Sequence, residues 1–443
     1  MKRQRNRRWR AAVTLGIALS LLTASACADD DDADDAANED SGDSGGDLDG
    51  TKVTLFGPEV EFEQQSLQDA FESFTEDTGI EVEVSGSRSF ETEVGPQVDA
   101  GNPPDIAMFP QPGKIRDFAA DIVPLPDDVL DVVSENIDEG WTSFATIDGD
   151  VLAIPAKADL KSVVWYSPAA FEEGGYEIPE TFDAFLELTD QMIEDGKTPL
   201  CVGIGSDDAT GWPFTDWVEE FVLRLEGPDV YDQWINHEIP FDDPAIVGAA
   251  EAVYDLWSKD GAVFGGLQNI GATPFAEAGL PLLEGDCLMH RQGNFYGSNF
   301  TDGGATLGED GDVNAFYFPG SDDNPNITLS GGIYATAFAD RPEVMEVMKY
   351  IASPEFGDSR AGNEIGGYLS PNKNVDTSLY TTELDQTFGE ILAAADPVRF
   401  DASDLMPGAV GSGSFWSAAV DIVAGTKTVK EAFADVEASW PSD

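Results

Sequence analysis

Lys52-Val-Thr-Leu-Phe56 and Ile80-Glu-Val-Glu-Val84 are short β-rich runs with a helical pattern between them that ends at Gly79. The apolar residues that fall on roughly one face of that pattern are Phe62, Leu67, Ala70, Phe71 and Phe74. A second helix-like stretch follows, broken by Gly101-Asn-Pro-Pro104 before the apolar run Ile106-Ala-Met-Phe109. Strand, helix, strand, helix and strand in this order predict an α/β sheet.

Ligands of open α/β sheets bind beyond the carboxyl ends of the strands. Glu59 comes soon after the first predicted strand. Met108, Pro110 and Gln111 lie at the end of the third. These residues are therefore the first candidates for a site.

The middle of the chain continues the pattern. Two β-rich pieces, residues 151–155 and 162–166, flank an expected polar turn at 156–161. Helices are expected to start at Pro168 and Pro179 and to dominate until about residue 300, and Gly331-Gly-Ile-Tyr334 reads as a returning strand.

The first residues have the features of a targeting segment. Six basic residues precede an apolar run, 11–22, that is too short to span a bilayer. Ala24-Ser-Ala-Cys27 resembles the bacterial lipobox, although Ala24 stands where Leu is usual. We expect a lipoprotein signal peptide over residues 1–27 with lipidation at Cys27; the alternative is ordinary secretion with cleavage before Cys27. Residues 28–50, rich in Asp, Ala, Ser and Gly, are expected to form a disordered acidic tether.

Charge and composition exclude several classes of function. The formal net charge is −62, and losing the six basic residues of the first 27 takes it to −68. Phosphate contacts need Lys and Arg, so nucleic acid is excluded as a partner, and anionic lipid is disfavoured. The spread of acidic residues suggests adaptation to salt. With only two histidines there is little material for a His-based metal site or a Ser-His-Asp triad.

The remaining cysteines, Cys201 and Cys287, form an even pair. In an oxidising extracellular setting such a pair favours one disulfide, and the alternative is two buried free thiols.

Ordered motifs cover nearly the whole body. They are Gly101-Asn-Pro-Pro-Asp105, Lys161-Ser-Val-Val-Trp-Tyr-Ser-Pro168, Pro179-Glu-Thr-Phe182, Ala209-Thr-Gly-Trp-Pro213 with Asp216-Trp217, Gly285-Asp-Cys-Leu-Met-His-Arg-Gln-Gly293, Ser330-Gly-Gly332, Gly366-Gly-Tyr368, Ser370-Pro-Asn-Lys373, and Phe400-Asp-Ala-Ser-Asp-Leu-Met-Pro407 with Phe415-Trp416. In order and spacing they resemble the extracellular solute-binding proteins of ABC sugar importers, in the maltose-binding-like group, and most closely its alpha-glucoside branch. The family commonly has Tyr-Asn or Tyr-Asp where this chain has Tyr166-Ser167.

The resemblance implies a two-lobed, periplasmic-binding-protein-like α/β fold with a ligand cleft between the lobes and hinge closure. Crossings are expected near residues 158–164, 306–313 and 366–372. Lobe one would comprise 51–160 plus 312–368, and lobe two 161–311 plus 369–443. The resemblance also implies a monomer without a cofactor. A protein of this kind would deliver a small sugar, such as maltose, trehalose or sucrose, to permease subunits at the extracellular face of a bacterial membrane.

A sugar site needs aromatic faces and side chains with two hydrogen-bonding atoms. Aromatic candidates are Trp212, Tyr368 and Trp416, each weighed against a role in the core; Trp165 is assigned to hinge or core packing. Polar candidates are Glu59, Gln111, Lys161, Arg291, Gln292, Asn294, Asp401 and Asp404. Lys161 is expected to bond a hydroxyl or to pair with Asp159, and Arg291 to bind ligand or pair with a structural acid. Gly332 would let backbone approach the ligand closely.

Three alternatives stay open. A glycosidase needs two carboxylates at controlled separation, one with a raised pKa, and the many acidic residues do not exclude it. A binding protein for a polyol, an oligosaccharide or a peptide is the second, and an adhesin or structural lipoprotein the third. The strand and helix order, the tether and the lack of an acid/base motif favour a binding protein that is not an enzyme.

Overall fold

The structure, a computed structural model, describes residues 48–363 and 367–441, which belong to one compact unit. The predicted signal peptide, Cys27 and nearly all of the predicted tether lie outside the described residues. None of the helices in the described part combines the length and apolarity that a membrane span requires.

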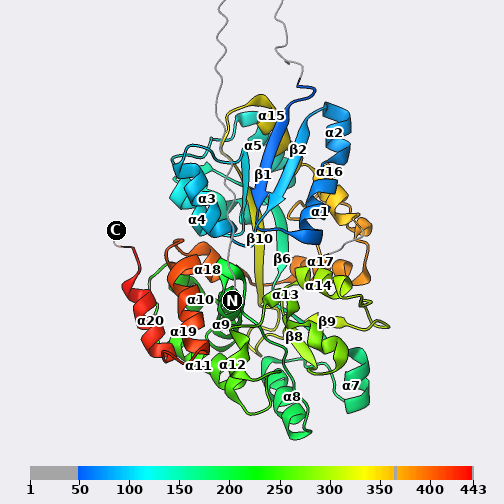
Figure 1. Ribbon diagram of the computed structural model, residues 1–443, viewed down its shortest axis with the longest axis vertical. Helices are drawn as coiled ribbons and strands as arrows, with labels where there is room; N and C mark the ends of the chain where they lie inside the picture. Colours follow the sequence, from blue (N-terminus) through cyan, green and yellow to red (C-terminus); the bar gives the residue numbers. More distant parts are fainter. Residues whose placement is uncertain (1–47, 364–366, 442–443) are drawn as a thin grey trace, which may run out of the picture. The chain divides into compact units, whose positions relative to one another are not determined.

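A six-stranded mixed sheet lies at the centre of one part of the protein, which we call the first part although two of its strands come late in the sequence (Figure 1). Its strands are β1 (Lys52–Gly57), β2 (Glu81–Gly86), β3 (Ile106–Phe109), β6 (Ile154–Leu160), β10 (Thr328–Ala337) and β11 (Val398–Phe400). β1 pairs in parallel with β2 and with β3, while β10 runs antiparallel to β3 and to β6. The three strands predicted first are confirmed. Since β1, β2 and β3 are parallel, their carboxyl ends meet at one end of the sheet.

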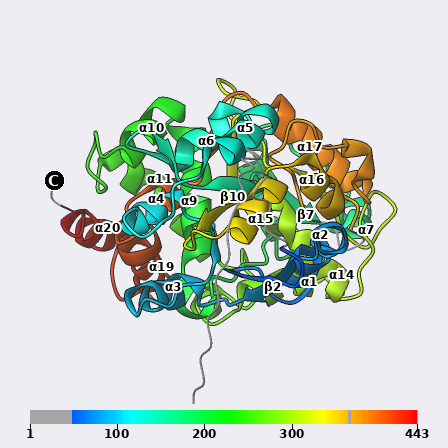
Figure 2. The ribbon, with the colours of Figure 1, turned by 90° about the horizontal axis from the view of Figure 1, so that it is seen from above.

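Helices cover both faces of this sheet because its strands alternate apolar side chains between two cores. Val53 and Leu55 of β1 pack in one core, and Phe56 packs in the other. The first core is closed by α1 (Glu61–Asp69), α2 (Glu72–Thr78), α5 (Asp127–Asn136), α15 (Pro342–Ile351) and α16 (Pro354–Ala361). The second is closed by α3 (Phe90–Asp99) and α4 (Pro112–Ile115), and Figure 2 shows α3 and α4 on the opposite side of the sheet from α1, α2 and α16.

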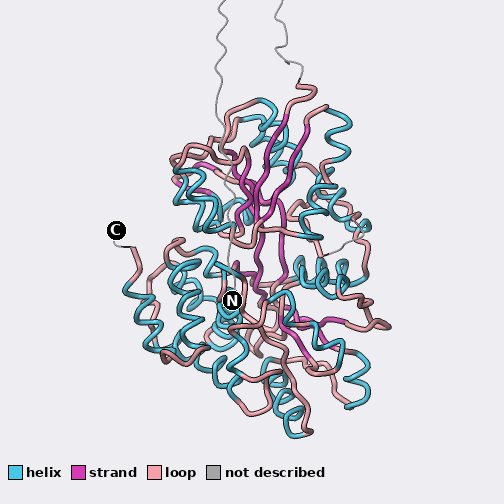
Figure 3. The backbone as a smooth tube through the Cα atoms, in the orientation of Figure 1, coloured by secondary structure: helices cyan, strands magenta, loops and turns pink. Residues whose placement is uncertain are grey.

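The second part is mainly helical around a three-stranded antiparallel sheet, as the distribution of helices and strands shows (Figure 3). The strands are β7 (Val163–Tyr166), β8 (Met289–Arg291) and β9 (Asn314–Tyr317). The helices are α7 (Pro168–Gly174), α8 (Phe182–Glu194), α9 (Trp212–Leu225), α10 (Pro228–Ile235), α11 (Pro244–Ser258), α12 (Leu267–Ile270), α13 (Phe275–Ala278), α14 (Gly297–Asp302), α17 (Glu383–Ala394), α18 (Ala402–Leu405), α19 (Trp416–Val423) and α20 (Val429–Ala438). α9 is buried along most of its length and packs against α11 and α19.

Residues 156–161 do not form the expected polar turn. Residues 156–160 belong to β6, whose seven residues are all buried and which pairs with β10 over most of its length, and Lys161 follows the strand directly. Lys157 and Asp159 are tolerated in this strand because they face partners of opposite charge. The turn prediction was wrong because charged residues usually indicate an exposed segment, whereas Lys157 and Asp159 form ion pairs in the protein interior.

The chain passes from the larger sheet to the smaller one between β6 and β7, within the predicted crossing at 158–164. The predicted crossing near 306–313 lies too early, because β9 still pairs with β7 and the chain reaches β10 only after Tyr317. Residues 364–366 of the third predicted crossing lie outside the described part, while Leu369 bridges to Ala158 of β6.

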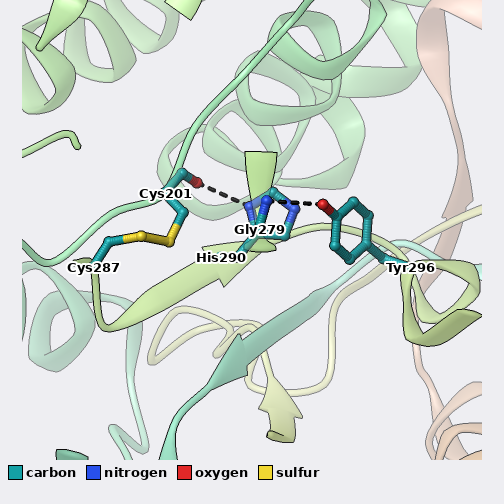
Figure 4. The surroundings of a disulfide bond; sticks show 5 residues. All are labelled: Cys201, Gly279, Cys287, His290 and Tyr296. Carbon is teal, nitrogen blue, oxygen red and sulfur yellow. Dashed lines mark hydrogen bonds between the residues drawn. A yellow bond between two sulfur atoms is a disulfide. The ribbon is translucent and has the colours of Figure 1, made fainter. Parts of the chain in front are cut away.

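Cys201 and Cys287 are joined by a disulfide with Cα atoms 5.5 Å apart (Figure 4). The backbone oxygen of Cys201 accepts a hydrogen bond from His290 Nδ1 at 2.9 Å. The His290 ring lies against Tyr296, whose hydroxyl accepts from Gly279 N at 2.8 Å. This bridge fastens the segment that follows α8 to the start of β8.

Candidate functional site

A pocket opens at the carboxyl ends of β1, β2 and β3. Its empty space is about 890 Å³, part of it open to solvent. The walls come from strand ends of the six-stranded sheet on one side and from α9, α13 and α18 on the other. The predicted site residues that line it are Glu59, Gln111, Lys161, Trp212, Gly332, Asp401, Asp404 and Trp416.

Aromatic rings form one wall. Trp212, at the start of α9, lies edge-on to Phe275 with ring centroids 5.0 Å apart, and Phe295 is 6.2 Å from the same indole. All three rings are half-buried, so each keeps part of its surface toward the pocket. Trp416, at the start of α19, adds a buried indole. Such faces stack on apolar C–H surfaces of a ligand.

The aromatic wall is supported by the region of the disulfide. Tyr296, the neighbour of Phe295, donates its hydroxyl proton to the Ala276 carbonyl at 2.9 Å, beside Phe275. Tyr296 also contacts His290, which is bonded to Cys201 (Figure 4). The disulfide therefore stabilises the elements that carry the two phenylalanines.

A first charge cluster surrounds Lys157 of β6. Its ammonium lies 3.0 Å from Glu63 and 3.5 Å from Glu59, and 3.6 Å from Asp159. Arg360 of α16 binds both oxygens of Glu59, at 3.0 and 3.4 Å. Burial alone lowers the pKa of Lys157, but the carboxylates outweigh it and hold the pKa above its ordinary value.

Glu59 and Asp159 share Lys157 yet shift in opposite directions. Burial raises the pKa of both carboxyl groups. For Glu59, the charges of Arg360 and Lys157 outweigh burial and lower the pKa. No arginine binds both oxygens of Asp159, so the effect of burial prevails and its pKa is raised. Glu59 is therefore held as an anion that can accept hydrogen bonds from ligand hydroxyls.

A second cluster surrounds Lys161, directly after β6. Its ammonium lies 3.1 Å from Asp216 of α9, 2.5 Å from Asp401 and 3.9 Å from Asp404. Burial raises the pKa of Asp216 to about 6 despite the nearby Lys161. Lys161 lowers the pKa of Asp401 to about 2, against the effect of burial. The predicted pairing of Lys161 with Asp159 is replaced by these partners, because Asp159 lies closer to Lys157 on the strand.

Several buried polar atoms on the pocket wall have no hydrogen-bond partner among the described residues. They are Gln111 Oε1 and Trp416 Nε1; Asp159 Oδ1 also makes no hydrogen bond, but it lies 3.6 Å from the Lys157 ammonium. The Gln111 amide nitrogen donates to Glu91 Oε1 at 3.1 Å, which leaves the amide oxygen free. Leaving such atoms unpaired costs about 1–3 kcal/mol each, so the wall is suited to a ligand with both donors and acceptors.

Glu91 and Asp404 are further carboxyl groups of the pocket. Burial raises the pKa of Glu91. Burial and then the Asp401 charge raise the pKa of Asp404 well above its usual range. Within the described residues, no group of His, Cys, Asp and Glu side chains has the geometry to hold a metal ion.

Gly332 lies in β10 on the pocket wall, and packing within the sheet also requires a glycine there. A Cβ there would lie 2.5 Å from the backbone oxygen of Lys157. The glycine therefore permits the close pairing of β10 with β6. Gly211, at φ 123°, plays a similar part because its Cβ would lie 2.4 Å from the backbone oxygen of Trp416.

Four predicted site residues do not line the pocket. Arg291 binds Asp216 at 3.1 Å and Glu220 at 2.8 Å, so it supports the Lys161 cluster from behind. Asn294 bonds to the backbone of Leu160 and Gly367. The Gln292 side chain accepts from the backbone NH of Gly293 at 2.9 Å, and the Tyr368 hydroxyl donates to the Ala156 carbonyl at 3.2 Å. Trp165 is buried and donates to the Gln292 carbonyl, which fits the packing role expected of it.

Sequence reasoning missed several charged residues of the pocket, among them Lys157 and Asp216. A signal for each was present. Lys157, Asp159 and Lys161 alternate with apolar residues, which places them on one face of a strand. Trp212, Asp216, Glu220 and Arg224 recur every four residues, which places them on one face of α9. Phe275 and Phe295 carried no comparable signal, because they sit in short helical turns far apart in the sequence.

The sequence matches the family model of the bacterial extracellular solute-binding proteins over residues 60–357. It is 39% identical over 403 residues to the osmoprotective compounds-binding protein GgtB of Synechocystis sp., covering 89% of this chain and 94% of that protein. It is 36% identical over 412 residues to the alpha-glucosides-binding periplasmic protein AglE of Rhizobium meliloti, covering 90% and 89%.

Solved structures share the fold. The maltose-bound MalE3 of T. maritima superimposes with a TM-score of 0.68 at 18% identity, covering 88% of this chain and 98% of that one. The galactose-binding solute receptor AcbH gives a TM-score of 0.74 at 17% identity, covering 88% and 97%. The protein thus has the two-lobed fold of maltose-binding-like proteins, and this chain belongs to the family of bacterial extracellular solute-binding proteins.

Proposed function

We propose that this protein is the cargo-binding component of a sugar ABC importer, that its cargo is an α-linked glucoside such as maltose, trehalose or sucrose, and that it works as a monomer held at the extracellular membrane face by lipidated Cys27. The lobes of the proposal are the predicted segments 51–160 plus 312–368 and 161–311 plus 369–443, except that residues 312–317 join the second lobe because β9 pairs with β7. The 36% identity to the alpha-glucosides-binding AglE supports the choice of cargo.

The observation that carries the proposal is the chemistry of the pocket. An aromatic wall of Trp212, Phe275 and Phe295 is combined with unpaired polar atoms of Gln111 and Trp416. A sugar ring offers an apolar face for stacking and hydroxyl groups at its edge, and each hydroxyl both donates and accepts. The free amide oxygen needs a donor and the free indole NH needs an acceptor, so one polyhydroxyl ligand satisfies both.

The charged groups that line the pocket narrow the range of ligand classes further. The pocket is lined by seven carboxyl groups and three basic side chains, Arg88, Lys157 and Lys161, and each of these bases already pairs with an acid. A phosphorylated or carboxylated ligand would meet net negative charge without a free cation. A neutral ligand is therefore favoured.

A second cargo is favoured by the relative named for osmoprotective compounds, which shares 39% identity with this chain. A neutral osmoprotective compound with hydroxyl groups would use the same aromatic wall and hydroxyl-binding atoms.

A thermal-shift screen against maltose, trehalose and sucrose tests the proposal, since a ligand that binds the folded state stabilises it by about 2.7 kcal/mol at one hundred times its Kd. We expect at least one saccharide to raise the unfolding temperature in a saturable way. No shift with any saccharide contradicts the assignment. Prolonged incubation with maltose should release no glucose, and release of glucose would favour a glycosidase instead.

A further inference from the structure

A groove runs outward from the pocket between the start of α1 and α14. It is a shallow space open to solvent, and its wall includes Phe62 and Asn299. Glu63, Arg88 and Phe275 line both the groove and the main pocket, so the two spaces are contiguous. A ligand seated in the pocket can therefore extend into the groove.

We propose that this groove is a subsite for one further sugar ring of an α-linked oligosaccharide, with Phe62 as its stacking face. The inference rests on the proposed sugar-binding function and extends it to ligands longer than the main pocket holds.

Exposure of Phe62 is the first observation that supports the subsite. Its side chain is 46% exposed, although most large apolar side chains of the described residues are buried. An exposed aromatic ring beside a ligand pocket presents a face that a sugar ring can cover, and covering it removes apolar surface from water.

The surroundings hold Phe62 in place. The preceding residue, Glu61, has φ 56°, a left-handed conformation that is uncommon for a residue with a side chain. Arg88 binds Glu61 Oε2 at 3.2 Å and stacks over the Phe275 ring at 5.3 Å from its centroid. Arg88 thereby links the start of α1 to the aromatic wall of the pocket.

Polar groups suited to sugar hydroxyls flank the two rings. The Asn299 side-chain amide has no hydrogen-bond partner within the described part of the chain and offers both a donor and an acceptor. The remaining N–H groups of Arg88 are donors that its single hydrogen bond to Glu61 leaves available. The groove thus repeats the combination of an aromatic face and unpaired polar atoms found in the main pocket.

The test measures the affinities of methyl α-glucoside, maltose and maltotriose by isothermal titration calorimetry for the wild type and for Phe62→Ala. We expect Phe62→Ala to weaken the binding of the longest ligand that the wild type accepts about tenfold, and to leave methyl α-glucoside within about twofold. Phe264→Ala is the matched control, because Phe264 is 42% exposed and lies outside both the pocket and the groove.

The outcomes separate the subsite from the function. If the wild type binds saccharides but Phe62→Ala changes no affinity, or lowers all affinities equally, the subsite is overturned and the sugar-binding function stands. Unchanged affinities would favour a protein partner as the occupant of the surface around Phe62. Wild-type binding of methyl α-glucoside without maltose or maltotriose also overturns the subsite. If the wild type binds none of the three ligands, the subsite is overturned, and the thermal-shift screen with trehalose and sucrose decides whether the proposed cargo stands.

Discussion

Lys161 Nζ donates a hydrogen bond to Asp216 Oδ1 at 3.1 Å across the wall of the pocket. Lys161 follows the last strand residue of β6, whereas Asp216 projects from the second turn of α9. The pair therefore joins the strand that leads out of the six-stranded sheet to a buried helix of the other part. Asp216 is also held by Arg291, so the site is assembled from residues distant in the sequence.

Lys161→Met should destabilise the protein by about 3–5 kcal/mol, because buried Asp401 would lose its nearest cation and buried Asp216 would lose one of its two. Urea unfolding at pH 7 measures the change. Lys52→Met, which removes an exposed pair with Glu83, is the control and should leave stability unchanged. Equal midpoints for Lys161→Met and the wild type would show that the pair contributes little.

Trp212→Ala should weaken saccharide binding about tenfold or more without unfolding the protein, because the indole is half-buried and its ring is part of the aromatic wall. Calorimetric titration with the best ligand of the thermal screen measures the loss. Trp440→Ala removes a half-buried indole that stacks on His237 outside the pocket, and should bind as the wild type does. Unchanged affinity in Trp212→Ala removes Trp212 from the site.

His290 should make stability depend on pH. Burial, with a smaller effect of Arg291, lowers its pKa from the ordinary 6.5 to about 4. The folded protein then binds fewer protons than the unfolded chain, so stability that is present above pH 6.5 is lost as the pH falls from 6.5 toward 4, by up to about 3 kcal/mol.

His290→Asn should reduce this loss, because the asparagine amide can still donate to the Cys201 carbonyl but does not titrate. The measurement is the free energy of unfolding in urea between pH 7 and pH 4.5. Identical slopes in His290→Asn and the wild type would contradict the assignment.

Replacing both Cys201 and Cys287 with Ser should cost roughly 2–5 kcal/mol of stability, because the bridge closes a loop with a sequence separation of 86. Unfolding midpoints with and without dithiothreitol provide the comparison. The reductant should destabilise the wild type and leave the double variant unchanged. A wild type insensitive to reductant in the unfolding transition would argue against the bridge.

Cys27→Ala should release the protein from bacterial membranes into the soluble fraction, since one residue carries the proposed lipid. Cell fractionation with metabolic palmitate labelling measures both location and acylation. Cys201→Ala serves as the control and should keep the label. Label retained in Cys27→Ala would place the lipid elsewhere.

The fold was largely predictable from sequence because its first strands and helices are short, periodic and separated by Gly and Pro. Residues 52–56, 80–84 and 106–109 all became strands of one sheet. The position of a site at the carboxyl ends of these strands followed from the same pattern, and Glu59 and Gln111 line the pocket there.

The partners within the site were not predictable in the same way. Arg291 and Asn294 are polar and clustered in sequence, but their side chains face buried partners and not the pocket. The sequence predicts a turn at Lys157, because charged residues rarely occupy a buried strand without partners. Those partners, Glu59 and Glu63, come from another element, and a single sequence does not show tertiary pairing.

Equilibrium titration of the purified protein with maltose, trehalose and sucrose, followed by calorimetry, tests the central claim most directly. A tripeptide and a sugar phosphate serve as ligands of other classes. The account predicts saturable one-site binding of at least one of the neutral saccharides and no binding of the peptide or the sugar phosphate. Saturable binding of the peptide or the phosphate, with no heat from any saccharide, would contradict it.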